Sequence, residues 1–355
     1  MSTEKLQVAV VGLGRMGMRH ARHFATLTPR AHLVAVCSPV QAELDAAKNE
    51  FGGHLRTYLD YDRMLQHEPT LQAVVVASVA SAHAEQAVKA IERGLHVLCE
   101  KPLSTSLEEA ECVLAAYKKS LLTRPGQKVM CGFSRRFDAS YRDAHARVAR
   151  GDIGVPSVFR SQTCDKLDLS TFTPAYSGIF TESSVHDIDL TLWFLGEDSR
   201  VKSVFAAGIT AIEPALRERN DRDNGIGIVE FYNGKIAQLL VSRMMAAGQE
   251  DTTEIIGTQG KIAVNAAPQL NLVHIHDATG IRREVPADYF GRFREAFITE
   301  ANEFTASCLN DTPAPIRLDS TVNAMKIACA LQESMVTGQK VEFDESGQRV
   351  SLAKL

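Results

Sequence analysis

A glycine-rich segment near the start of the chain has the spacing of a phosphate-binding turn. It reads G-L-G-R-M-G over residues 12–17 and follows a short apolar run. Gly12 would allow a tight turn, Gly14 the close approach of a pyrophosphate, and Gly17 the packing of a helix against a strand. Arg15 and Met16 would begin that helix, whose free N–H groups attract phosphate. We predict a dinucleotide site here; the alternative is a glycine turn without a ligand.

The choice of dinucleotide depends on the residue that ends the second apolar run, which is Ser38. A carboxylate at that place would bond the hydroxyls of the adenosine ribose and repel a 2′-phosphate. Serine does neither, Glu43 follows later in the chain, and Arg15 is the only cation near the turn. We expect NAD as the cofactor with a modest preference, and NADP remains open.

A lysine directly follows another apolar run, in the order Glu100-Lys101-Pro102. The carboxyl edge of a parallel sheet is where open α/β folds bind their ligands. Lys101, held by the fixed φ of Pro102, could orient a substrate hydroxyl and stabilise alkoxide character as hydride leaves. The alternative is a surface lysine at the end of a strand.

A third group of polar residues lies in a predicted buried helix over residues 181–195. Glu182, His186 and Asp189 are spaced i, i+4 and i+7, which would place them on one face of that helix. A buried imidazole next to carboxylates could act as a general base for a hydroxyl proton. A structural histidine and a metal site are the alternatives.

The elements that must position these residues follow from the apolar runs. Five runs, at 8–11, 33–37, 73–77, 97–99 and 129–131, alternate with amphipathic stretches such as 82–93 and 107–119. This order is typical of an α/β fold with a doubly wound parallel sheet, a Rossmann domain over residues 1–130.

From residue 131 to 355 the pattern predicts a second α/β domain with a large, open and mainly antiparallel sheet. Strands are expected near 157–163 and at 226–232 and 235–241, the last two joined by a hairpin at Asn233-Gly234. Helices are expected at 139–150, 293–308 and 320–336.

The bulk composition excludes several classes of protein. The 355 residues carry 39 basic and 43 acidic side chains, a net charge of −4, without a basic block, so neither nucleic acid nor a membrane is an expected partner. No leader segment or membrane-length apolar run is visible, and we expect a cytoplasmic protein. Seven cysteines without a C-x-x-C pair indicate neither a disulfide framework nor a metal site.

Taken together, these motifs resemble the glucose–fructose oxidoreductase, inositol dehydrogenase and rhizopine-catabolism (Gfo/Idh/MocA) family, and within it the inositol dehydrogenases. Ser78 and His83 after the third run, G-F-S-R-R-F-D at 132–138, H-D-I-D at 186–189 and Trp193 strengthen the resemblance, which covers essentially the whole chain.

The resemblance implies reversible NAD(P)-linked oxidation of a secondary hydroxyl on a cyclitol, such as myo- or scyllo-inositol, or on a pyranose sugar, by a homodimer or homotetramer. It implies three catalytic residues, Lys101, His186 and Glu182. It implies substrate contacts by Asp189, Arg136 and Asp165. Cofactor contacts would come from the glycine turn and from Ser38, Ser78, His83, Glu100 and Lys101.

Three positions depart from the inositol dehydrogenase pattern. Glu182 replaces the usual aspartate, no arginine precedes Asp165, and Ser38 replaces the acid that favours NAD. An NADPH-dependent reductase of keto-sugars or aldoses, and a non-catalytic regulator that senses dinucleotides with the same fold, therefore stay as alternatives. The presence of Lys101 and His186 favours an enzyme, because a sensor needs neither.

Overall fold

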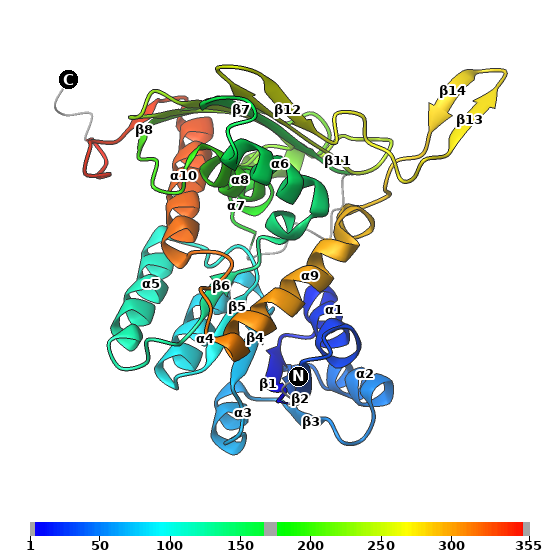
Figure 1. Cartoon of the computed structure of the whole chain (residues 1–355), viewed down its shortest axis with the longest axis vertical. Helices are drawn as coiled ribbons and strands as arrows, with labels where there is room; N and C mark the ends of the chain where they lie inside the picture. Colours follow the sequence, from blue (N-terminus) through cyan, green and yellow to red (C-terminus); the bar gives the residue numbers. More distant parts are fainter. Residues whose placement is uncertain (1–3, 167–175, 351–355) are drawn as a thin grey trace. The chain divides into compact units, whose positions relative to one another are not determined.

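A computed structural model describes residues 4–166 and 176–350 (Figure 1). These residues form two units. The first contains the chain up to Ser134 together with Glu295–Val322, and the second contains Arg135–Arg294 and the chain from Asn323. The first unit thus includes residues from both sides of the expected boundary at 130/131, because most of helix α9 (Tyr289–Asn310) packs within it.

The first unit is built on a six-stranded parallel sheet in the order β3-β2-β1-β4-β5-β6 (Figure 1). The strands are β1 (Leu6–Val11), β2 (Ala31–Cys37), β3 (Arg56–Tyr58), β4 (Ala73–Val76), β5 (His96–Cys99) and β6 (Val129–Cys131). Five of them are the predicted apolar runs. The order reverses between β1 and β4, as in dinucleotide-binding sheets, and confirms the predicted doubly wound fold.

Helices connect these strands and begin close to their carboxyl ends. They are α1 (Arg15–Arg22) with its π-helical extension (His23–Leu27), α2 (Gln41–Phe51), α3 (Tyr61–His67), α4 (Ala80–Glu92) and α5 (Leu107–Leu121). Two start at side-chain caps: Asp60 accepts from the Arg63 N–H (2.8 Å) and Ser106 from the Glu109 N–H (3.2 Å). The two helices predicted in this region are confirmed within two residues at each end.

The second unit contains a seven-stranded sheet in the order β12-β11-β7-β10-β9-β8-β15. Its strands are β7 (Pro156–Cys164), β8 (Val201–Ile209), β9 (Asn224–Phe231), β10 (Ile236–Ser242), β11 (Glu250–Gly257), β12 (Lys261–Val264) and β15 (Val341–Glu342). Only β7 and β10 pair in parallel, so the expected mainly antiparallel sheet is confirmed. The predicted hairpin joins β9 to β10, with Gly234 at φ +79°.

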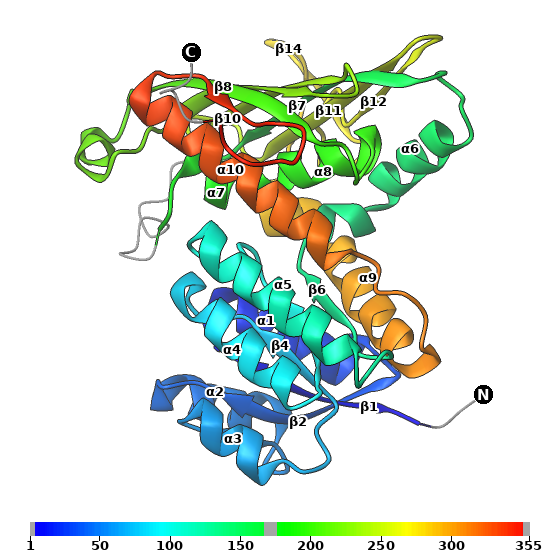
Figure 2. The ribbon, with the colours of Figure 1, turned by 90° about the vertical axis from the view of Figure 1, so that its left-hand side faces the viewer.

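One face of this sheet is covered and the other is open (Figure 2). Phe180 of α7 (Ile179–Glu182) and Leu331 of α10 (Leu318–Thr337) pack so closely on β9 that a Cβ at Gly227 would lie 3.0–3.1 Å from them. The helices α6 (Ala139–Ala149) and α8 (Val185–Leu195) belong to the same unit. A separate two-stranded hairpin, β13 (His274–Asp277) and β14 (Gly280–Arg283), extends from the unit in Figure 1.

The predicted single helix over 181–195 is wrong. The structure contains α7 and α8 in its place, separated by Ser183 and Ser184. Serine side chains compete with helical backbone hydrogen bonds, and the Ser183 hydroxyl accepts a hydrogen bond from Arg243 at the end of β10 (2.6 Å). A contact with a distant strand therefore holds the chain at this break.

Candidate active site

The glycine-rich turn leaves the central strand β1 and enters α1. Gly12 has φ +82°, and a Cβ there would lie 2.3 Å from the Ser78 backbone; at Gly17 it would lie 1.7 Å from the Gly12 carbonyl oxygen. Larger residues at these two positions would force β1, β4 and α1 apart. At Gly14 a Cβ would meet nothing within 4 Å. The turn therefore leaves open space before the N–H groups of α1, as a bound pyrophosphate requires.

Ser38 ends β2 at the same edge of the sheet as the glycine turn. Its side chain is buried, donates a hydrogen bond to Glu43 Oε2 (2.5 Å) and accepts one from the Val40 N–H (3.1 Å). Ser38 and Glu43 are five residues apart in the sequence. The first turn of α2 brings them into contact.

Ser78 and His83 follow β4. The Ser78 hydroxyl donates to Gln86 Oε1 (2.7 Å), and the buried His83 ring lies between two carbonyl oxygens, of Pro102 (2.7 Å from Nδ1) and of Ser78 (3.2 Å from Nε2). The imidazole thus connects the loop after β4 with the loop after β5. Direct contact of Ser78 or His83 with a dinucleotide remains a prediction.

Lys101 follows β5 and is anchored by its neighbour Glu100. The buried Glu100 carboxylate accepts the Lys101 backbone N–H (3.1 Å) and lies 2.7 Å from His20 Nε2. Burial alone would raise the pKa of Glu100, but the His20 hydrogen bond and nearby positive charges outweigh burial and lower it. An ionised carboxylate therefore fixes the backbone at Lys101, and the Lys101–Pro102 peptide bond is cis.

A second buried carboxyl group, Glu300 of α9, belongs to the same unit. Phe297, one turn earlier on α9, makes an edge-on contact with the His20 ring (6.4 Å between centroids). Burial, followed by the charge of Glu100, raises the pKa of Glu300 well above its usual range. Sequence reasoning missed both His20 and Glu300. Glu300 could have been noticed as an acid within the apolar face of a predicted helix, and His20 as a histidine one turn after the glycine motif.

In the second unit, the structure brings together two residues predicted to contact substrate. Arg136 donates two hydrogen bonds to Asp189, from Nε (2.8 Å) and Nη2 (2.7 Å), and its third nitrogen pairs with Glu197. Arg136 and Asp189 are both buried. Burial raises the pKa of Asp189 even though the charge of Arg136 opposes that shift.

A neighbouring network fixes α8 against the sheet. The fully buried Arg135 pairs with Asp187 (2.9 Å) and Asp251 (2.7 Å), and Asp187 also accepts from the Ser161 and Thr163 hydroxyls (2.6 Å each). Burial raises the pKa of Asp251 to about 6 against the opposing charge of Arg135. These contacts hold the helix that carries His186 and Asp189.

His186 and Glu182 lie on different helices, so the predicted shared helical face is wrong for Glu182. His186 is buried in the first turn of α8, with Nε2 3.4 Å from the Tyr289 hydroxyl. Glu182 ends α7 and accepts a hydrogen bond from Ser177 (3.1 Å). Tyr289 was missed, because it lies about 100 residues from His186 in the sequence and in no recognisable motif.

No arginine directly precedes Asp165 in the sequence, but the structure places an arginine from another strand end next to it. Arg243, at the end of β10, donates to Asp165 Oδ2 (2.8 Å) and to the Ser183 hydroxyl (2.6 Å). The parallel pairing of β7 with β10 places the two strand ends side by side. A guanidinium therefore adjoins Asp165 from another strand.

Comparison with known protein families identifies this arrangement. Residues 6–123 match the oxidoreductase family with an NAD-binding Rossmann fold, and residues 141–263 match the Gfo/Idh/MocA C-terminal domain. The chain belongs to the Gfo/Idh/MocA family. It is an oxidoreductase, and its first unit is an NAD-binding domain.

Individual members of the family match over nearly the whole chain. The scyllo-inositol 2-dehydrogenase (NAD(+)) of Bacillus subtilis is 30% identical over 96% of this chain and 97% of its own length. The myo-inositol 2-dehydrogenase of Thermotoga maritima is 26% identical over 96% of this chain and 99% of its own length. The structure of scyllo-inositol dehydrogenase from Lactobacillus casei with bound NAD(H) and scyllo-inositol has a TM-score of 0.88 to this chain. The two sequences are 33% identical, and the match covers 96% of this chain and 99% of that one.

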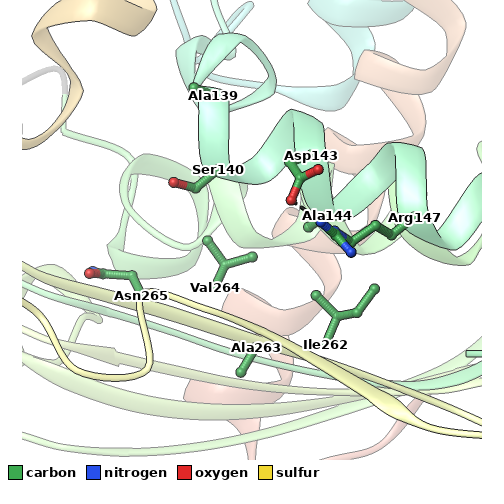
Figure 3. Close-up of a pocket in the computed structure, with 9 residues that line it drawn as sticks. All are labelled: Ala139, Ser140, Asp143, Ala144, Arg147, Ile262, Ala263, Val264 and Asn265. Carbon is green, nitrogen blue, oxygen red and sulfur yellow. Dashed lines mark hydrogen bonds and ion pairs between the residues drawn. The ribbon is translucent and has the colours of Figure 1, made fainter. Parts of the chain in front are cut away.

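One pocket is lined by none of the candidate site residues discussed above (Figure 3). It runs between α6 and β12, and its charged lining residues, Asp143 and Arg147, pair with each other (2.8 Å). Within residues 4–166 and 176–350, no three His, Cys, Asp or Glu side chains are grouped to hold a metal ion. In the same ranges no helix has the length and hydropathy needed to cross a bilayer.

Proposed function

We propose that this chain oxidises a secondary hydroxyl group of a cyclitol of the myo- or scyllo-inositol type, with NAD as hydride acceptor. The observation that carries the proposal is the match over 96% of the chain to a scyllo-inositol dehydrogenase structure that holds NAD(H) and scyllo-inositol. The related enzymes of Bacillus subtilis and Thermotoga maritima, named for the same two cyclitols, support it.

Lys101 is proposed to act on the reacting oxygen. Bound NAD would accept a hydride from the substrate carbon, while the hydroxyl proton leaves to the protein. An ammonium group that donates to the hydroxyl oxygen stabilises the negative charge that develops there. The buried Glu100 carboxylate supports this role, because its bond to the Lys101 N–H fixes the backbone from which the side chain extends.

His186 is proposed to take the hydroxyl proton. A neutral imidazole can accept it, and the nearby Tyr289 hydroxyl (3.4 Å) would help to orient the ring. Glu182 is proposed to stabilise the resulting imidazolium charge. The network around Arg135 and Asp187 supports the role of His186, since it keeps α8 in place.

Two ion pairs are proposed to recognise the other substrate hydroxyls. Arg136 with Asp189, and Arg243 with Asp165, each combine hydrogen-bond donors with carboxylate acceptors. A polyol that offers hydroxyls as both donors and acceptors matches such pairs, and a site built to bond hydroxyls rejects analogues that lack them.

A panel assay tests the proposal against its alternatives. Purified protein is mixed either with NAD+ or NADP+ and myo-inositol, scyllo-inositol or pyranose sugars, or with NADPH and keto-sugars or aldoses. The absorbance of reduced nicotinamide is followed in each mixture. We expect NADH formation with an inositol. Activity confined to NADPH and keto-sugars or aldoses would support a reductase, and dinucleotide binding without turnover would support a regulator.

We also propose that the chain self-associates through the open face of the seven-stranded sheet. Five apolar side chains on β8, β9 and β10 are between 38% and 62% exposed there: Phe205, Ile209, Ile226, Ile228 and Ile236. Exposed apolar patches of this kind mark interaction surfaces. Light scattering should show a dimer or tetramer that Ile228→Lys dissociates and that Ile281→Lys, on β14 outside this face, does not. A monomeric wild type would contradict the proposal.

A further inference from the structure

A carboxylate lies close to the end of β2 even though the residue that follows the strand is a serine. Ser38 is buried directly after β2, where the acid that binds adenosine ribose was expected. Its hydroxyl accepts the Val40 N–H (3.1 Å) and donates to Glu43 Oε2 (2.5 Å). Because Val40 fixes the serine oxygen on one side, the hydroxyl proton is directed at Glu43 on the other.

Glu43 lies where the backbone favours an acceptor side chain. It lies in the first turn of α2, where the N–H groups of the helix stabilise a negative charge. The side chain is partly exposed. Ser38 occupies one carboxylate oxygen, and the other, Oε1, makes no hydrogen bond to any residue in the described part of the chain. A carboxylate with one uncommitted oxygen can accept hydrogen bonds from a ligand.

The position of this carboxylate relative to the glycine turn follows from strand register. Val11 of β1 pairs with Cys37 of β2, so Gly12 and Ser38 leave the sheet at the same edge, and the Gly12 N–H donates to the Cys37 carbonyl (2.8 Å). In dinucleotide-binding folds the turn after β1 holds the pyrophosphate and an acid at the end of β2 bonds the adenosine ribose. Ser38 and Glu43 together lie at the second of these places.

We propose that Glu43, held by Ser38, binds the hydroxyls of the adenosine ribose and makes this enzyme selective for NAD over NADP. The carboxylate would accept hydrogen bonds from the ribose and would repel a 2′-phosphate. Arg15, exposed at the start of α1, is the cation that would otherwise favour the phosphate. This inference rests on the NAD-binding domain and not on the identity of the substrate, so it can fail while the proposed substrate class holds, and the reverse.

The competing explanation is that Glu43 only caps α2. A Glu in the first turn often bonds a residue just before the helix, and such a bond stabilises the helix without any ligand. Under that explanation Glu43→Gln would change stability and leave the relative affinity for the two dinucleotides unchanged. Under our proposal the ratio of affinities changes, because the amide loses the charge that repels the phosphate.

Binding measurements on the purified full chain separate the two explanations. The dissociation constants of NAD+ and NADP+ are measured by calorimetry, without substrate, for the wild type and for Glu43→Gln, Ser38→Ala and Asp45→Asn. Asp45 is the matched control, because it is exposed on the same helix, bonds only Gln41 among the described residues (2.8 Å), and loses the same unit of charge in its variant. Thermal unfolding of each variant checks that it is folded.

We expect the wild type to prefer NAD+ by about 10- to 100-fold, the range that hydrogen bonds to a charged group supply. Glu43→Gln should reduce that ratio by about tenfold or more, Ser38→Ala should reduce it less, and Asp45→Asn should leave it unchanged. An equal preference in the wild type and a folded Glu43→Gln variant would overturn the proposal. A wild type that prefers NADP+ would also overturn it.

Discussion

Glu300 is a buried acid whose protonation should set part of the pH dependence of folding. The side chain is fully buried, and burial together with the charge of Glu100 raises its pKa well above the usual range. In the unfolded chain a glutamic acid ionises with a pKa of about 4.3. Between these two pKa values the folded state binds one proton more than the unfolded state. The free energy of unfolding therefore falls as pH rises through this window.

Replacing Glu300 by glutamine removes this titration while it keeps the size and neutrality of the protonated acid. A difference of one bound proton changes the free energy of unfolding by about 1.4 kcal/mol per pH unit. Between about pH 5 and about pH 6 the wild type should therefore lose about 1.4 kcal/mol relative to Glu300→Gln. The variant should become the more stable protein toward alkaline pH.

Urea unfolding followed by circular dichroism at a series of pH values measures this difference. Glu295→Gln is the control, because Glu295 is exposed on the same helix and its variant should keep the wild-type pH dependence. Parallel curves for the wild type and Glu300→Gln would show that folding does not shift this carboxyl group, and the argument from burial would then be wrong.

Further variants test the proposed site and one of its ion pairs. Lys101→Ala should leave NAD+ affinity nearly unchanged and lower turnover by on the order of 100-fold or more, because a charge at the reacting oxygen is lost. Titration with NAD+ measures the affinity and steady-state rates measure the turnover. Unimpaired turnover in folded protein would exclude a catalytic role for Lys101. The oxidation rate of the wild type should fall toward acid pH as His186 is protonated, and His186→Ala should abolish that fall. Glu182→Gln should lower the rate less than His186→Ala does. If the rate of His186→Ala still falls toward acid pH as in the wild type, His186 is not the base. Asp189→Asn should destabilise the fold by about 3 kcal/mol, since the buried Arg136 loses the charge of Asp189. The Arg136→Met, Asp189→Leu double variant should recover most of that loss in urea unfolding, and a double variant no more stable than the single one would contradict this.

The fold could be predicted from the sequence wherever burial leaves a periodic record. Strands that are buried on both faces of a parallel sheet lack polar alternation, so β1, β2, β4, β5 and β6 are visible as apolar runs. β3 was missed, because its three residues, Arg56–Tyr58, are not fully buried and form no such run. The break between α7 and α8 was missed, because the contact that Ser183 makes at the break is with Arg243, a residue 60 positions later in the chain.

For the site, the sequence determined which side chains are available, and tertiary structure decided how they are paired. The glycine turn, Lys101 after β5 and the buried histidine in the second domain could be identified because each depends on local spacing. The contacts of Ser38 with Glu43, of Arg136 with Asp189 and of Asp165 with Arg243 could not, and two of these join residues more than 50 positions apart. Such pairs form because a charge removed from water needs a partner, and only the packing of distant elements determines which partner lies within hydrogen-bond distance.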